Sequence, residues 1–295
     1  MIKMRKFNLL IFAFCALFFY PNSKAQLLYK VEGNGLARPS YIFGTHHLAP
    51  LDVADKSGAI QYLDSVDIII GEIDLTQDME AAAMQMASHM IAPEDSTLSK
   101  VLTPEEYSLV DTALQKWAAM LGIELNLFDS MKPVVVSTML AQAIMSELLP
   151  DFDPSKQLDT FFMATGKLKG KKIRALETPE YQAVVLFDST PVSEQAKALV
   201  ALVKDPDKSI ELAKSINEAY YAGDLEAMFK LSQEEDENPE FMVALLDRRN
   251  ANWIEELPEM IKEDSAFIAV GALHLAGENG IINGLRERGY IVTPQ

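Results

Sequence analysis

One short motif occurs twice in this chain, and it constrains the fold more than any other feature. Residues 44–48 read Gly-Thr-His-His-Leu and residues 271–275 read Gly-Ala-Leu-His-Leu, so three of the four histidines lie in two similar segments far apart in the sequence. Each motif follows a short apolar run, at 40–43 and 266–270, that is typical of a buried strand. The pattern therefore predicts two strands that each lead through a glycine into a histidine.

The similarity continues beyond the motifs. The first is followed by a predicted helix at 56–65 and a strand at 66–70, and the second by a helix at 279–288 and a strand at 290–292. A match of strand, Gly-x-x-His, loop, helix and strand over roughly thirty residues is stronger evidence for an internal repeat than one motif alone. The sequence therefore predicts two related βαβ units at the two ends of the chain.

The segment between the units, at about 78–262, is predicted to be a large helical insertion. Apolar residues at helical spacing and start signals such as Thr103-Pro104-Glu105-Glu106 mark its helices. The predicted helices are 79–91, 104–121, 134–149, 158–166, 180–188, 193–203, 208–222 and 239–262. A further strand is predicted at 171–176, and an acidic linker at 234–239. We expect an α/β fold in which two related βαβ ends build the sheet.

The first 25 residues are predicted to be a secretory signal peptide. Basic residues precede an apolar run at 9–20, and small residues at Ser23 and Ala25 precede a predicted cleavage before Gln26. The run is shorter than the ~20 residues that a membrane helix needs, which argues against an uncleaved anchor. We predict an exported protein, periplasmic or secreted, with 26–295 as one domain and no transmembrane segment after cleavage.

Composition excludes several kinds of partner and ligand. The single cysteine, Cys15, lies in the predicted signal, so the mature chain has no disulfide and no thiolate metal ligand. The formal net charge is −17, and the charged residues that the predicted cleavage removes are all basic, so the mature chain is more acidic still. Nucleic-acid binding needs clustered Lys and Arg, so no nucleic-acid partner is expected.

Polar residues follow the carboxyl ends of the predicted strands, which is where α/β sheets bind their ligands. His47 and His274 follow two strand ends, and Glu72 and Glu177 follow two others. If these strands are parallel neighbours, two imidazoles and two carboxylates meet at one edge, which is a ligand set for a divalent transition metal. The metal would activate a water, the second carboxylate could act as base, and Arg249 could bind substrate or an oxyanion.

Each of these residues also has a structural interpretation. A histidine at a strand end is more often structural than catalytic, the two glutamates could be capping or surface acids, and Arg249 could be a salt-bridge partner. His46 is predicted to point away from His47, and His89 to be an ordinary helix residue. The matched positions of His47 and His274 favour the functional interpretation.

The paired motifs resemble those of the TraB/GumN family, which is related to the Tiki proteases. The matching segments are 41–48, 70–74, 157–159, 176–178, 249–253 and 270–280. In the Tiki branch the resemblance implies a metal-dependent peptidase associated with manganese or cobalt. It places His47, Glu72 and His274 at the metal site, with Arg249 as a further member. Glu177 lies in a family motif, whereas His46 stands where many members carry an apolar residue.

These observations together predict an exported metal-dependent hydrolase, in particular a peptidase that acts on peptides or proteins. The predicted metal ligands are His47, His274 and Glu72, and the predicted catalytic residues are Glu72, Glu177 and Arg249. The insertion would form a lid or groove wall. Three alternatives stay open: a non-catalytic protein that binds a peptide, haem or metal, a metal-independent esterase with a histidine base, and an assembly factor of the cell envelope.

Overall fold

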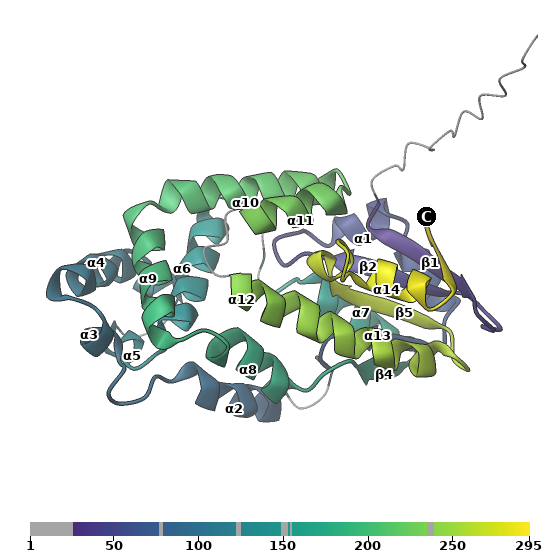
Figure 1. Cartoon of the computed structure of the whole chain (residues 1–295), viewed down its shortest axis with the longest axis horizontal. Helices are drawn as coiled ribbons and strands as arrows, with labels where there is room; N and C mark the ends of the chain where they lie inside the picture. The colour runs from purple at the N-terminus through teal and green to yellow at the C-terminus, as the bar shows by residue number, and fades with distance from the viewer. Residues whose placement is uncertain (1–25, 77–78, 122–124, 149–152, 154, 235–238) are drawn as a thin grey trace, which may run out of the picture.

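A sheet lies at one end of the molecule and a helical region at the other, as Figure 1 shows. The computed structural model describes residues 26–76, 79–121, 125–148, 153, 155–234 and 239–295. The signal peptide predicted for 1–25 lies outside the described residues. Within them, no helix combines the length and the hydropathy needed to cross a membrane.

The sheet has six strands in the order β4-β3-β5-β2-β1-β6. Their bounds are β1 Leu28–Gly33, β2 Ser40–Thr45, β3 Ile68–Gly71, β4 Lys172–Ala175, β5 Ala266–Gly271 and β6 Tyr290–Pro294. The first four strands in this order are parallel to one another, and β1 is antiparallel to both β2 and β6. Every residue of β2 and β3 is buried, as expected for parallel strands covered on both faces.

The strands that precede the two histidine motifs are neighbours. In the register of β2 and β5, Gly44 lies beside Val270 and Thr45 beside Gly271. The chain leaves β2 for β3 on one flank of this pair and leaves β5 for β6 on the other. The carboxyl ends of adjacent parallel strands are where α/β proteins bind ligands. The predicted convergence of strand ends is therefore present in the fold.

The two predicted βαβ units are both present, but they differ in detail. The single helix predicted at 56–65 is wrong, since the chain forms α1 (Asp52–Lys56) and a separate 3-10 turn at Ile60–Asp64. Gly58 between them has a φ of +72°, which no α-helix contains. In the second unit α14 (Ile281–Glu287) leads to β6 at the far edge, where β6 pairs with β1.

The segment between the units is mostly helical, and most predicted helices are confirmed within a few residues. Its helices are α2 Met79–Met90, α3 Leu98–Val101, α4 Pro104–Leu121, α5 Leu125–Phe128, α6 Pro133–Leu148, α7 Leu158–Leu168, α8 Pro179–Asp188, α9 Val192–Lys204, α10 Pro206–Tyr221, α11 Leu225–Glu234, α12 Pro239–Met242 and α13 Arg248–Ile261. The predicted capping box forms, because the amide of Thr103 donates to Glu106 Oε2 at 3.0 Å and the amide of Glu106 donates to Thr103 Oγ1 at 3.2 Å.

The described part of the molecule has two hydrophobic cores, one at the sheet and one in the helical region. The larger core contains the buried faces of the sheet together with α7, α13 and α14, and includes Phe43, Ile69 and Phe267. The smaller core lies among α3, α4, α6 and α9 and includes Leu140 and Leu199. The candidate site belongs to the sheet side, and α8 and α13 (Arg248–Ile261) reach it from the insertion (Figure 1).

Candidate functional site

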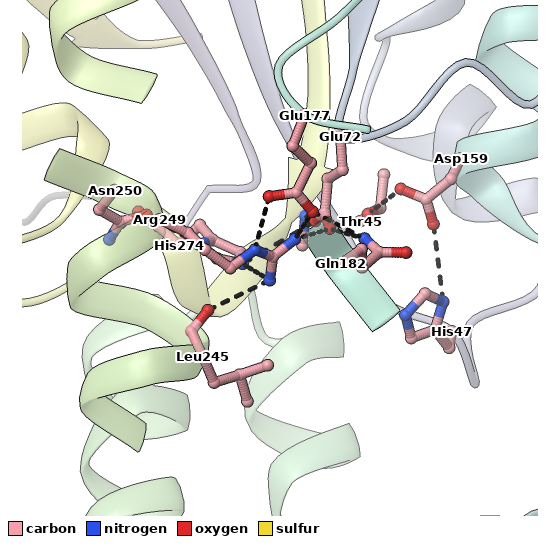
Figure 2. A network of polar contacts seen from close by, with 11 residues as sticks. Thr45, His47, Glu72, Asp159, Glu177, Gln182, Leu245, Arg249, Asn250 and His274 are labelled. Atoms are coloured by element: carbon pink, nitrogen blue, oxygen red, sulfur yellow. Dashed lines mark hydrogen bonds and ion pairs between the residues drawn. The ribbon is translucent and has the colours of Figure 1, made fainter. Parts of the chain in front are cut away.

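Two glutamates lie where β3 and β4 end, as the sequence predicts. The backbone holds these ends together, because the amide of Leu176 donates to the carbonyl of Gly71 at 3.0 Å and that of Glu177 to the carbonyl of Glu72 at 2.9 Å. The parallel ladder of β3 and β4 thus continues one step past the strands. As a result, the Glu72 and Glu177 side chains leave the same edge of the sheet beside each other (Figure 2).

Arg249 from α13 joins these two carboxylates, and its guanidinium is 3% exposed. Nη2 donates to Glu72 Oε2 at 2.5 Å and to Glu177 Oε1 at 2.7 Å, and Nε donates to Glu177 Oε2 at 3.0 Å. Nη1 donates to the carbonyl of Leu245 at 3.1 Å and to His274 Nε2 at 3.0 Å. These five contacts use all five N–H groups of an arginine. The guanidinium is therefore fully hydrogen-bonded inside the protein.

The helix changes type shortly before Arg249. Residues Val243–Asp247 form a π-helical turn immediately before α13. A π turn bonds residue i to i+5 instead of i+4, and such turns often occur at functional sites. Leu245 lies within this π-helical turn, four residues before Arg249, and its carbonyl accepts a hydrogen bond from Arg249 Nη1.

Glu72 is held in its ionised form. Its Oε1 accepts a hydrogen bond from the amide of Gly271 at 2.8 Å, and its Oε2 accepts one from Gln182 Nε2 at 3.1 Å in addition to that from Arg249. Burial by itself would raise the pKa of this carboxyl. The charge of Arg249 and the hydrogen bonds from Gly271 and Arg249 outweigh burial and hold the pKa of Glu72 well below its usual range.

Glu177 is more deeply enclosed. Its side chain is 3% exposed, and both of its oxygens accept hydrogen bonds from Arg249. Burial raises the pKa of Glu177 in spite of the arginine, and the nearby charge of Glu72 acts in the same direction. With Glu72 it also shares the amide of Gln182. Glu177 is thus placed to hold Arg249 and Gln182.

His274 is a buried, neutral acceptor. Arg249 can only donate, so His274 Nε2 accepts and the ring proton lies on Nδ1, which contacts Asn250 Oδ1 at 2.7 Å. Asn250 Nδ2 in turn donates to the carbonyls of His274 and Asn279, which sets the orientation of the amide. Burial lowers the pKa of His274 to about 3. The ring is therefore uncharged at neutral pH.

His47 lies on the other side of Glu72, as Figure 2 shows. Its side chain is 74% exposed, and Nδ1 is 3.7 Å from Asp159 Oδ2. Asp159 lies in the first turn of α7, and its Oδ1 accepts a hydrogen bond from Thr45 Oγ1 at 2.6 Å. Its Oδ2 is buried without a hydrogen-bond partner, and burial raises the pKa of this carboxyl. Asp159 therefore has one fixed oxygen and one that can still bind.

The other two histidines stand apart from this network. His46 turns inward, and its ring lies 5.0 Å from that of the fully buried Tyr220, whose hydroxyl donates to the carbonyl of Gly44 at 2.9 Å. Burial lowers the pKa of His46 to about 4. His89 on α2 contacts Asp188 on α8 at 2.5 Å. The opposite directions of His46 and His47 agree with the prediction.

The structure brings most of the predicted residues together. Glu72, Glu177, Arg249 and His274 form one continuous network, and His47 flanks it without a recorded contact to any of them. Sequence reasoning did not assign roles to Asp159, Gln182 or Asn250. Asp159 and Asn250 stand inside the family-like segments 157–159 and 249–253, which is the signal that could have identified them. Gln182 carries no such signal.

The predicted metal ligands match a metal in donor type but not as a ready-made set. Among the described residues, no three His, Asp or Glu side chains are close enough to hold an ion together. His274 Nε2 already accepts a hydrogen bond from Arg249. The unpartnered, buried Oδ2 of Asp159 beside His47 fits a cation on that side of the network. A metal therefore fits the His47 side.

Comparison with known proteins identifies one family. The family model described as TraB/PrgY/gumN matches residues 27–294, which is nearly the whole chain. No curated protein and no solved structure matches the chain.

Proposed function

The chain belongs to the TraB/PrgY/gumN family, and from this premise we propose that it is an exported, metal-dependent hydrolase whose substrates are peptides or unfolded protein segments. The observation that carries the proposal is the combination of the ionised Glu72, the exposed His47 and the buried Asp159 beyond the carboxyl ends of β3 and β2. A water molecule at this edge would lie among groups that can orient it and accept its proton.

The metal would be held by His47, as predicted from the sequence, together with the free Oδ2 of Asp159. Glu72, the second predicted ligand, would lie beside this pair as the carboxylate that activates water. When bound, the metal would lower the pKa of a water molecule and polarise the carbonyl of the substrate. His274, the third predicted ligand, could join only if Arg249 released its Nε2.

The charge balance of the network supports a cationic ligand. Glu72 and Glu177 carry two negative charges when ionised, Arg249 carries one positive charge, and His274 is neutral. One negative charge is therefore left over in a buried region, and ionised Asp159 adds a second. Buried charge without a partner is costly, so a divalent cation or a substrate ammonium group would be favoured there.

The chain's own residues divide the remaining tasks. Asp159 supplies its one free oxygen to the metal, and the ionised Glu72 takes up a proton from water. Glu177 and Arg249, both predicted to be catalytic, are only 3% exposed and bind each other through two hydrogen bonds. We assign these two residues to holding Glu72 in its orientation.

A second candidate function rests on the same pair of side chains. His47 Nδ1 lies 3.7 Å from Asp159 Oδ2, and a histidine oriented by a carboxylate is the usual arrangement of a general base. A metal-independent esterase would use the His47–Asp159 pair directly.

The test measures metal content and peptide hydrolysis of the purified protein with manganese, cobalt, zinc or no added metal. We expect bound metal, turnover that a chelator removes, and recovery when the metal is restored. Glu72→Gln should be folded and inactive, and His89→Gln serves as the matched control because His89 lies outside the network. Full activity in chelator would favour the esterase, and peptide binding without turnover would favour a binding protein. Export is tested by whether the mature chain begins at Gln26.

A further inference from the structure

We infer that His274 is a positioning residue: its ring fixes Arg249, and through it Glu72, and it binds neither metal nor substrate. This inference rests on the proposed function in one respect, the identity of Glu72 as the reacting carboxylate. It assigns different roles to the two matched histidines, and it places the reacting groups beside His47.

The first argument is that both ring nitrogens of His274 are already bonded. Nδ1 contacts Asn250 Oδ1 at 2.7 Å, and Nε2 accepts from Arg249 Nη1 at 3.0 Å. Neutral imidazole has one donor and one acceptor, so no lone pair is left for a metal. The carboxylate nearest to the ring, Glu72 Oε1, is 3.9 Å away and is itself bonded to the amide of Gly271.

The second argument is that Arg249 has no alternative acceptor to turn to. Its five N–H groups have five partners, and its side chain is 3% exposed. If a metal took Nε2 of His274, one buried N–H would lose its partner, which is unfavourable. The metal would also lie directly beside the guanidinium, and the two positive charges would repel each other.

The third argument is the way in which α13 surrounds the ring. Arg249 and Asn250 contact the two nitrogens, and Trp253, one turn further along, lies 4.4 Å from the ring of His274. The guanidinium of Arg249 also lies over the Trp253 ring in a cation–π contact, with Cζ 4.6 Å from the ring centroid. Three side chains of one helix therefore fix the position and the tautomer of His274. This is how a protein holds an acceptor rigidly in place.

The experiment is a nitrogen-15 NMR measurement on protein labelled at its histidines, with Zn²⁺ as the metal probe. Only four histidines are present, so single substitutions assign every ring. We expect His274 to show a neutral ring protonated at Nδ1, and its Nε2 signal to stay in place while Zn²⁺ moves the signals of His47. An Nε2 signal of His274 that moves with bound Zn²⁺, or a ring protonated at Nε2, would overturn the inference.

The two proposals can fail separately in this experiment. If no Zn²⁺ binds, the metal dependence of the proposed function is lost, yet the tautomer of His274 still decides the positioning role. If Zn²⁺ binds through His274 as well as His47, the metal site stands and the positioning role is wrong.

Variants supply a second, independent readout. Glutamine offers one acceptor and one donor, so His274→Gln should keep Arg249 in place and leave Zn²⁺ affinity unchanged. His47→Gln and Asp159→Asn should each weaken Zn²⁺ binding by about tenfold or more. The control is His89→Gln, which replaces a histidine outside the network. Loss of Zn²⁺ binding in folded His274→Gln, to the same extent as in His47→Gln, would contradict the inference.

Discussion

The two Gly-x-x-His motifs begin alike and end in different surroundings. After Gly44 the strand continues to Thr45 and the chain turns at the surface, so that the side chain of His47 is 74% exposed. After Gly271 the chain enters a 3-10 turn at Ala272–His274, and the side chain of His274 is 5% exposed. One repeated motif thus produces one histidine open to solvent and one locked inside the protein.

The neighbours of each motif explain this difference. The first motif is next to the start of α7, which offers His47 only the carboxylate of Asp159. The second lies against α13, which offers a guanidinium, an amide and an indole. Both helices lie outside the repeated unit. The comparison teaches that a repeat specifies where a side chain starts, while unrepeated helices decide what it contacts.

The strongest way to break this arrangement is to remove the cation at its centre. Arg249→Ala would leave Glu72 and Glu177 buried without their positive partner, and we expect a loss of about 3–5 kcal/mol in the free energy of unfolding. Urea unfolding followed by circular dichroism measures this loss. The matched control is Arg248→Ala, since the Arg248 side chain is 62% exposed and forms a surface ion pair with Glu240 at 3.5 Å. The control should change stability by no more than about 0.5 kcal/mol.

Equal losses in the two arginine variants would show that the buried network contributes no more than a surface ion pair. That result would remove the physical basis for treating the second motif as a rigid unit.

The next prediction compares the two histidines directly. His274→Ala leaves one N–H group of Arg249 and the Oδ1 of Asn250 without their buried partner, so the free energy of unfolding should fall by about 2–4 kcal/mol. His47→Ala changes an exposed ring and should stay within about 0.5 kcal/mol. The order should reverse for hydrolysis, where His47→Ala is expected to cost about 10²–10⁴-fold in kcat. Stability and turnover are measured on the same preparations.

Two results for His47→Ala would contradict this comparison: a structural role for His47, or no role in catalysis. The first would appear as a large loss of stability in His47→Ala, and the second as full turnover in a folded variant.

The sequence alone predicts some parts of this structure and not others. β2, β3 and β5 were predictable because each is a short, almost wholly apolar run, and β4 because basic and apolar residues alternate along it. Four of the candidate residues, His47, Glu72, Glu177 and His274, were predictable because they follow strand ends. The pairing of β6 with β1 was not predictable, because it joins strands from the two ends of the chain. The helix predicted at 56–65 failed at Gly58, whose positive φ the apolar pattern does not reveal.

Within the site, residue types were easier to predict than contacts. The sequence identified Arg249 and His274 as site residues, but not the hydrogen bond between them, which depends on how α13 packs against the sheet. It also missed Asp159, because an aspartate in the first turn of a helix is common for reasons of capping and dipole alone. Tertiary packing, which no local pattern encodes, decides both.

Acid sharpens the contrast between the histidines. The pKa of His274 is lowered from 6.5 to about 3, so between these pH values the unfolded chain binds a proton at His274 that the folded chain does not. The contribution of His274 to stability therefore falls with the pH, by about 1.4 kcal/mol per pH unit and so by about 2 kcal/mol at pH 5. His46, with a pKa of about 4, acts in the same direction, whereas the contribution of Glu72 is lost only below pH 4.5. The raised pKa values of Asp159 and Glu177 act in the opposite direction, so the test compares variants with the parent protein.

His274→Gln should remove its own part of this slope, and His47→Gln should leave the slope as it is. Urea unfolding between pH 7 and pH 5 measures both variants against the parent protein. An unchanged slope in His274→Gln would mean that the ring is protonated in the folded protein.

The smallest expected effect tests the support of the first motif. Thr45→Val keeps the shape of the side chain but removes the hydrogen bond to Asp159 Oδ1, and we expect a loss of about 1 kcal/mol in the free energy of unfolding. Thr112→Val, at an exposed position of α4, is the matched control and should change little. Because Thr45 lies beside Gly271 in the sheet, a loss much larger than 1 kcal/mol would mean that the first motif also supports the buried network. The two motifs would then form one structural unit, and the separation of roles between His47 and His274 would have to be given up.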